Sequence, residues 1–132
     1  MNRLLILNLY YAPESFGGAT IVVEQTARRL SDAHDWAVLV VTTMRDHSMP
    51  RYALRRYRIN GVDVIAINVP GESTGEEEYR NSEIARRVIE IARAFQPDVC
   101  HCHAIQVLGC EYFDELRKKK KKIAITAHDC WW

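Results

Sequence analysis

The sequence predicts an α/β fold, a doubly wound (Rossmann-like) parallel sheet with helices on both faces. Near-continuous apolar runs at residues 4–10, 36–43, 98–103 and 123–127 are typical of strands that are buried on both sides. Between these runs, apolar residues recur at helical spacing, with charged residues on the opposite face. Strands that alternate with amphipathic helices favour a parallel sheet covered by helices on both faces.

The first helix is predicted from apolar side chains that share one helical face, namely Ala19, Val22, Val23, Thr26, Ala27 and Leu30. It follows a loop, residues 11–18, that contains Pro13, Gly17 and Gly18. A right-handed crossover through this helix places the strand at 36–43 beside the first strand.

A hairpin is predicted next. Asn60 and Gly61 form a two-residue turn signal between the apolar segments 57–59 and 62–69. We therefore expect a small antiparallel hairpin on one side of the sheet.

Two more helices are expected. Ile84, Val88, Ile91 and Phe95 mark the apolar face of one, which Pro97 closes and which begins somewhere between residues 75 and 82. Residues 107–118 form a shorter amphipathic pattern, which uses Leu108, Tyr112, Phe113 and Leu116. Trp131 and Trp132 follow a central strand directly and would normally pack against further structure. Residues 1–132 are therefore expected to be a C-terminally truncated domain.

Composition narrows the function classes. The chain is 48% apolar and 27% charged, and its net charge of +1 gives no field that favours nucleic acid. No segment approaches the roughly 20 apolar residues of a membrane span, and residues 4–7 are too short for a signal peptide, so we expect a cytoplasmic protein. The lysine run at 118–122 is expected to be a solvated helix end. A phosphate or membrane-surface patch at the inner face of the membrane stays the alternative.

Four alternating residues, Cys100, His101, Cys102 and His103, resemble a metal cluster at first sight. In a strand, the two thiols point to one face and the two imidazoles to the other, so the four cannot converge on one ion. We therefore expect reduced, buried thiols and no metal site. His101 is expected to be an interior histidine with its hydrogen bonds satisfied.

Ligands in such sheets bind beyond the carboxyl ends of the strands, where the strand order reverses. That edge should carry the loop 11–18 and the segments after the strands at 98–103 and 123–127. Gly17 and Gly18 open a helix whose N–H groups suit an anion, although they also fit a simple tight turn.

The dinucleotide fingerprint G-x-G-x-x-G is absent, which disfavours a nicotinamide cofactor. His103 and His128, which is followed by Asp129, lie at the same edge.

Several segments resemble one family together. Residues 5–14, 17–19 and 22–30 resemble the opening of family 4 (group 1) glycosyltransferases. Residues 97–103 resemble the family segment P-D-(V/I)-x-H-x-H, and residues 126–132 its segment T-x-H-D-x-W-W.

The resemblance implies the GT-B fold, in which two Rossmann-like domains face each other across a cleft. It implies transfer of a sugar from a nucleotide-sugar donor with retention, without a metal or other cofactor. In this family, His128 would contact the donor sugar and support catalysis, and Gly17 and Gly18 would lie near the donor diphosphate. His103 and Asp129 would line the cleft, and Glu14 is a candidate from its position in the loop.

In this family the N-terminal domain mainly binds the acceptor, which here is an unidentified sugar, lipid or small molecule. The domain that holds the nucleotide is absent from residues 1–132, so we expect no transfer by this chain alone. One alternative is a non-catalytic module that binds a sugar or nucleotide. Another is a flavin carrier, on a loose phosphate-loop likeness of Ser15, Gly17 and Thr20. An unfinished sheet edge could also support a dimer.

Overall fold

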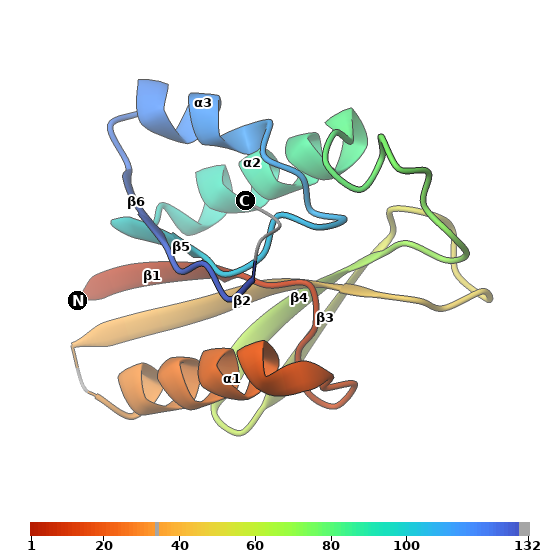
Figure 1. Cartoon of the computed structure of the whole chain (residues 1–132). Coiled ribbons are helices and arrows are strands. Elements are labelled where there is room, and N and C mark those ends of the chain that lie inside the picture. The colour runs from red at the N-terminus through yellow and green to blue at the C-terminus, as the bar shows by residue number, and fades with distance from the viewer. Residues whose placement is uncertain (34, 130–132) are drawn as a thin grey trace.

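The computed structural model describes residues 1–33 and 35–129 (Figure 1). Within this part the strands are β1 (Asn2–Leu7), β2 (Trp36–Met44), β3 (Leu54–Ile59), β4 (Val62–Asn68), β5 (Val99–Cys102) and β6 (Lys122–Ile125). The helices are α1 (Gly17–Asp32), α2 (Ser82–Phe95) and α3 (Tyr112–Lys118). The prediction about Trp131 and Trp132 lies outside the described residues.

The strands form one sheet in the order β3-β4-β2-β1-β5-β6. All neighbours are parallel except β3 and β4, which are antiparallel. From β1 the chain first builds the sheet outward through β2 to β4 and then returns to place β5 on the other side of β1. The strand order therefore reverses at β1, which lies between β2 and β5.

Helices cover both faces of this sheet, as Figure 1 shows. Helix α1 packs on one face through Val23 and Ala27, against Leu4 and Ile6 of β1 among others. Helices α2 and α3 lie on the other face. The predicted doubly wound α/β fold is confirmed.

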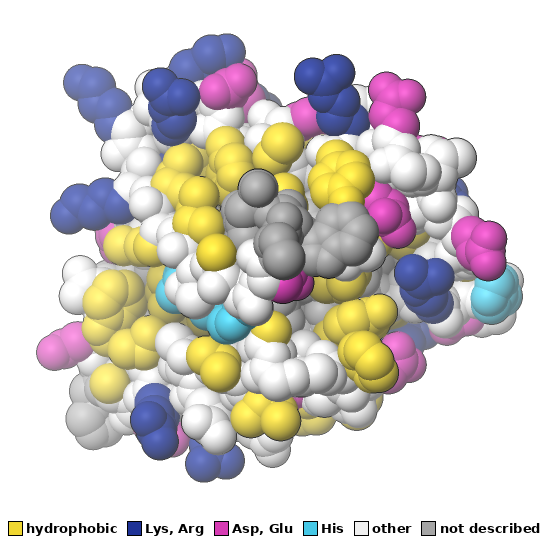
Figure 2. Space-filling model, in the orientation of Figure 1, with side chains coloured by type: hydrophobic (Ala, Val, Ile, Leu, Met, Phe, Trp, Pro, Cys, Tyr) yellow, Lys and Arg dark blue, Asp and Glu magenta, His cyan; other side chains and the backbone are white. Residues whose placement is uncertain are grey.

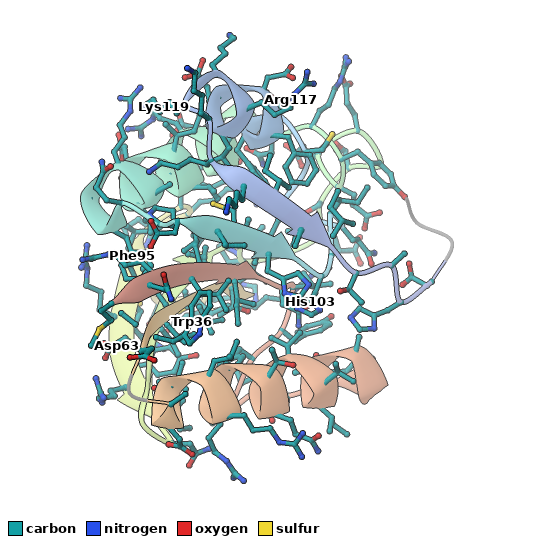
Figure 3. All side chains as sticks on the ribbon, turned by 90° about the vertical axis from the view of Figure 1, so that its left-hand side faces the viewer. Trp36, Asp63, Phe95, His103, Arg117 and Lys119 are labelled. Carbon is teal, nitrogen blue, oxygen red and sulfur yellow. The ribbon has the colours of Figure 1, made fainter. Side chains whose placement is uncertain are left out.

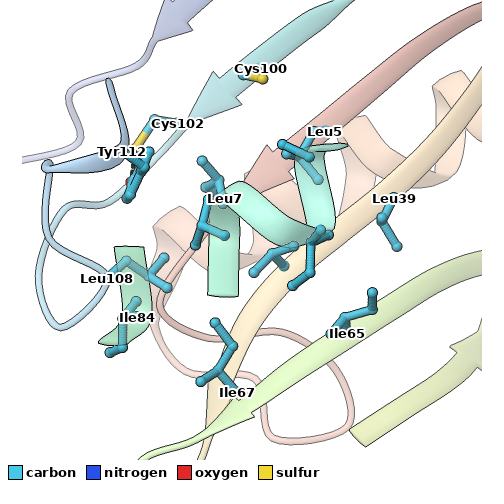
Figure 4. Close-up of a cluster of buried hydrophobic side chains, with 14 of the residues drawn as sticks. Leu5, Leu7, Leu39, Ile65, Ile67, Ile84, Cys100, Cys102, Leu108 and Tyr112 are labelled. Carbon is cyan, nitrogen blue, oxygen red and sulfur yellow. Dashed lines mark hydrogen bonds between the residues drawn. The ribbon is translucent and has the colours of Figure 1, made fainter. Parts of the chain in front are cut away.

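The larger core lies between the sheet and α2 with α3 (Figure 4). Leu5 and Leu7 of β1, Ile84 of α2 and Tyr112 of α3 are all fully buried in it. Because side chains alternate along each strand, neighbouring residues of β1 supply opposite cores. This explains why the strand sequences are apolar without interruption.

The predicted hairpin is confirmed. Asn60 and Gly61 have φ angles of 50° and 78°, as a type I′ turn requires, and join β3 to β4. Strand β4 is also parallel to β2, so the hairpin extends the main sheet and leaves β3 at its edge.

Helix α2 starts within the predicted range, whereas helix α3 starts later than predicted. Helix α2 begins at Ser82, where the side-chain oxygen of Asn81 caps it by accepting a hydrogen bond from the Ile84 N–H at 3.2 Å. Helix α3 begins at Tyr112 rather than at residue 107. Val107 and Gly109 have φ angles of 66° and 71°, which an α-helix does not allow.

The segment before α3 packs closely on the segment before α2. The Val107 N–H donates to the Glu78 carbonyl at 2.7 Å. A Cβ at Gly109 would lie only 2.9 Å from the Tyr79 carbonyl oxygen. Glycine is therefore favoured at position 109 for two reasons: it tolerates the positive φ angle, and it has no Cβ to clash with the Tyr79 carbonyl.

Among the described helices, none is both long enough and apolar enough to cross a membrane.

Candidate functional site

The switch point at β1 carries a cavity of about 150 Å³, between the carboxyl ends of the strands and the start of α1. Its walls come from the segment after β1, the first turn of α1, the segment after β5 and the segment after β6. The lining residues are Asn8, Leu9, Tyr10, Phe16, Ala19, Thr20, His103, Ala104, Ile105, Gln106, His128 and Asp129. This is the edge at which the sequence predicted a ligand site.

Two histidines from neighbouring strand ends meet in this cavity. Nδ1 of His103 lies 2.9 Å from Nε2 of His128, and the two rings are nearly parallel, with centroids 5.2 Å apart. His103 is only 3% exposed, whereas His128 is half-buried. Burial, with the nearby His101 and His128, lowers the pKa of His103 to about 3, so this imidazole is neutral at pH 7.

Figure 3 shows His103 near the end of the sheet opposite to Phe95 and Asp63. In Figure 2, histidine side chains reach the surface near the middle of the face, while lysines and arginines lie mostly toward its outline. Asp129 is the one lysine, arginine or acidic residue among the described residues that line the cavity.

His101 lies one layer deeper on the same face of the sheet. Its Nε2 atom is 2.8 Å from the Thr126 hydroxyl, and its ring centroid is 4.0 Å from that of His103. Burial and the neighbouring His128 lower the pKa of His101. The prediction that His101 is hydrogen-bonded is confirmed for Nε2, and the side chain is half-buried.

Asn8 and Thr20 form the floor of the cavity. The Asn8 amide donates to the Tyr10 carbonyl at 2.7 Å and to the Thr20 hydroxyl at 3.4 Å, and both residues are buried. The Thr20 hydroxyl in turn donates to the Phe16 carbonyl at 2.6 Å. Sequence reasoning missed Asn8 as a site residue, although a polar residue directly after the buried run of β1 was a usable signal.

Gly17 and Gly18 form the first residues of α1. The φ angle of Gly17 is +80°, which favours glycine, whereas Gly18 has no such requirement. A Cβ at either position would meet no atom within 4 Å, so the space before this backbone is open. Their neighbours Phe16 and Ala19 line the cavity.

The two remaining candidate site residues, Asp129 and Glu14, line different cavities. Asp129 is exposed and lines the cavity beside His128. Glu14 instead lines a separate cavity of about 170 Å³, together with Arg55 and Tyr57. The structure thus brings His103, His128 and Asp129 together but leaves Glu14 outside.

The cysteines of β5 point away from the cavity. Cys100 and Cys102 belong to the core under α2 and α3, and burial raises the pKa of each thiol to about 11. The predicted alternation of thiols and imidazoles is confirmed. Within residues 1–33 and 35–129, no three histidine, cysteine or acidic side chains are grouped as metal ligands.

The comparison with protein families gives one match. The family model described as Glycosyltransferase Family 4 covers residues 16–132. The chain belongs to glycosyltransferase family 4. This confirms the resemblance seen in the sequence, and it leaves the flavin-carrier alternative without support.

Solved structures share the fold of this family 4 chain. Sucrose-phosphate synthase from Thermosynechococcus elongatus matches with a TM-score of 0.66 and 15% identity, over 98% of this chain and 33% of its own. The catalytic domain of starch synthase IV from Arabidopsis thaliana, bound to ADP and acarbose, matches with a TM-score of 0.68 and 19% identity. The match covers 97% of this chain and 34% of that chain. α,α-Trehalose 6-phosphate synthase from Burkholderia multivorans matches with a TM-score of 0.56 and 14% identity. This match covers 94% of this chain and 32% of that chain.

The chain thus spans about a third of the length of these glycosyltransferases. The comparison with curated protein sequences gave no significant match.

Proposed function

We propose that residues 1–132 are the acceptor-side, N-terminal part of a retaining glycosyltransferase that uses a nucleotide-sugar donor. The observation that carries the proposal is the cavity at the switch point, where His103 and His128 meet opposite the start of α1. Crevices at this position are the usual ligand sites of open α/β sheets. Membership of family 4 supplies the reaction class.

His128 is the residue proposed to contact the donor sugar. It is half-buried, and the hydrogen bond between one of its ring nitrogens and His103 fixes the orientation of its ring. A positioned imidazole can hydrogen-bond a sugar hydroxyl and supports charge redistribution in the transition state. Asp129 lies beside it at the rim of the cavity.

The start of α1 is proposed to lie near the donor diphosphate. Phe16, the N-cap residue, makes no side-chain cap, and the first turn contains no acidic residue. The first N–H groups of a helix lack intrahelical partners and attract anions. The open space in front of Gly17 and Gly18 lets a phosphate approach this backbone.

Transfer is proposed to need neither a metal nor another cofactor from this chain. Glu14 is the least supported of the proposed residues, because it faces a different cavity.

This chain alone is proposed to transfer no sugar. Stabilising a leaving diphosphate requires donors that converge on it from more than one side. A cavity of about 150 Å³ is smaller than the roughly 300–1,000 Å³ of a typical ligand pocket. A second wall, supplied by a further domain, would complete the cleft.

An amide-resolved NMR titration of the chain with UDP-glucose and GDP-mannose tests the binding step. We expect shifts at Asn8, Gly17, Gly18 and His128, with none at Asp63, which lies at the far end of the sheet. Shifts scattered over the surface, or none with any nucleotide sugar, would overturn the donor-binding proposal.

Catalysis is tested in the longer protein that contains a second domain. There, His128→Ala should lower kcat/KM for sugar transfer by about 10²-fold or more, in the range seen when a transition-state contact is removed. Unchanged activity would remove the role assigned to His128. Nucleotide-sugar binding without transfer by the two-domain protein would instead favour a non-catalytic module.

A further inference from the structure

We propose that His103 is a positioning residue, which donates its Nδ1–H to Nε2 of His128 and thereby makes His128 present an Nδ1–H donor to the ligand. The inference rests on the proposed function only in its last step, the identity of that ligand.

The starting point is the 2.9 Å contact between Nδ1 of His103 and Nε2 of His128. Two nitrogens at this distance share one hydrogen, so one ring donates and the other accepts. A neutral imidazole has a single N–H. The direction of this hydrogen bond therefore determines the tautomer of both rings.

The environment of His103 decides the direction. Its other nitrogen, Nε2, is buried and has no hydrogen-bond partner. A proton on Nε2 would leave a buried N–H without an acceptor, a rare arrangement that costs about 1–3 kcal/mol. A proton on Nδ1 is used in the bond to His128 and leaves only a lone pair without a partner. The Nδ1–H tautomer is the favoured one.

His128 does not compete with this choice. It is half-buried at the cavity, so its remaining nitrogen can meet water or a ligand in either role. The buried environment of His103 thus determines the tautomer of both His103 and His128.

The consequence for chemistry is specific. With Nε2 of His128 accepting from His103, the hydrogen of His128 lies on Nδ1, the nitrogen left for a ligand. The side chain then acts as a hydrogen-bond donor to an acceptor oxygen of the ligand. In its neutral form it is not available there as a base.

The test is a long-range ¹H–¹⁵N NMR measurement on the 132-residue chain with ¹⁵N-labelled histidine at pH 7.5. Such spectra distinguish protonated from bare ring nitrogens. We expect Nδ1 protonated and Nε2 bare in both His103 and His128. Protonated Nε2 in His128 would overturn the proposal, and this measurement needs no variant.

Variants then separate positioning from packing. His103→Asn places an amide nitrogen near the position of Nδ1 and should keep the Nδ1–H tautomer of His128. His103→Leu removes the donor and should let the proton of His128 shift toward Nε2 or exchange between the two. His101→Gln, which keeps both partners of the His103–His128 hydrogen bond, is the control and should leave the tautomer of His128 unchanged. An unchanged tautomer in His103→Leu would contradict the proposal.

A nucleotide-sugar titration of the same sample separates the two proposals. If the tautomers are as expected but UDP-glucose and GDP-mannose leave the His128 nitrogens unshifted, the positioning role stands and the donor-binding function fails.

Discussion

The hydroxyl of Tyr57 donates a hydrogen bond of 2.8 Å to the carbonyl oxygen of Ala12, 45 residues earlier in the chain. This bond ties β3, at the sheet edge, to the loop that precedes α1. Tyr11 is buried beside it, and this burial, with the charge of Glu24 and the nearby Tyr57, raises its pKa to about 12. The loop at the ligand edge is thus held from the hairpin side of the sheet.

Tyr57→Phe removes this bond without changing the ring. We expect a loss of about 1 kcal/mol in the free energy of unfolding, because the carbonyl of the buried Ala12 loses its donor. Urea denaturation followed by circular dichroism measures it. Arg58→Lys, at an exposed ion pair with Asp63, is the control and should stay within about 0.5 kcal/mol. Equal stabilities for all three proteins would show that the bond contributes nothing.

Gly109→Ala tests the close approach between the segments that precede α2 and α3. The new Cβ would lie 2.9 Å from the Tyr79 carbonyl oxygen, in a backbone with a φ of 71°. We expect a destabilisation of about 1–3 kcal/mol in urea unfolding. Gly75→Ala is the matched control, since a Cβ there meets nothing within 4 Å and its φ angle is ordinary. A Gly109→Ala protein as stable as the control would mean that the segments separate at little cost.

The neutral, buried His103 makes stability depend on pH. Its folded pKa is about 3, while an unfolded histidine titrates near 6.5. Between these two pH values, His103 is protonated in the unfolded chain but not in the folded chain. The free energy of unfolding therefore falls as the pH drops below about 6.5 toward 3. This histidine alone should contribute a slope of about 1.4 kcal/mol per pH unit. His101, whose pKa is also lowered, adds in the same direction.

Urea denaturation at pH 7.5, 6.0 and 5.0 measures this slope. His103→Asn carries no titrating group at 103 and should show a shallower dependence, although it can be less stable at pH 7.5. Parallel pH profiles for the two proteins would argue against the neutral state of His103.

The thiols of β5 should resist alkylation. A rise of the pKa from 9.0 to about 11 lowers the thiolate fraction about 100-fold at pH 8, and burial blocks access further. Cys110 is exposed and should react with iodoacetamide before Cys100 and Cys102. Peptide mapping by mass spectrometry after timed labelling, with a fully denatured sample as reference, gives the rates. Labelling of Cys100 or Cys102 as fast as Cys110 would show that β5 opens readily.

Much of the fold was predictable, because strands buried on both faces leave apolar runs and helices leave a periodic stripe. The start of α3 was not. Leu108 continues the helical pattern of Tyr112, yet Val107 and Gly109 adopt positive φ angles and make tertiary contacts with residues 78 and 79. Periodicity records which side chains are buried, and a compact non-helical segment buries them just as well.

The site was predictable only in part. The two-residue period of a strand predicted that His101 and His103 share a face, and the switch-point rule predicted that His128 lies nearby. The hydrogen bond between His103 and His128 was not predictable, because it depends on ring rotations and on the path of the chain after β6. That Glu14 lines a different cavity was not predictable either, because position in a loop does not determine which side of the loop a side chain faces.

The alternation along β5 also limits how this part of the chain can change in length. Strand β5 pairs Leu5 with Cys100 and Ile6 with His101, in a register that the buried faces fix. Insertion of a single residue between Pro97 and Val99 would invert this parity, so that imidazoles enter the apolar core and thiols line the ligand cavity. A two-residue insertion would preserve the parity. We therefore expect the fold to tolerate insertions between Pro97 and Val99 only when they contain an even number of residues, whatever the residues are.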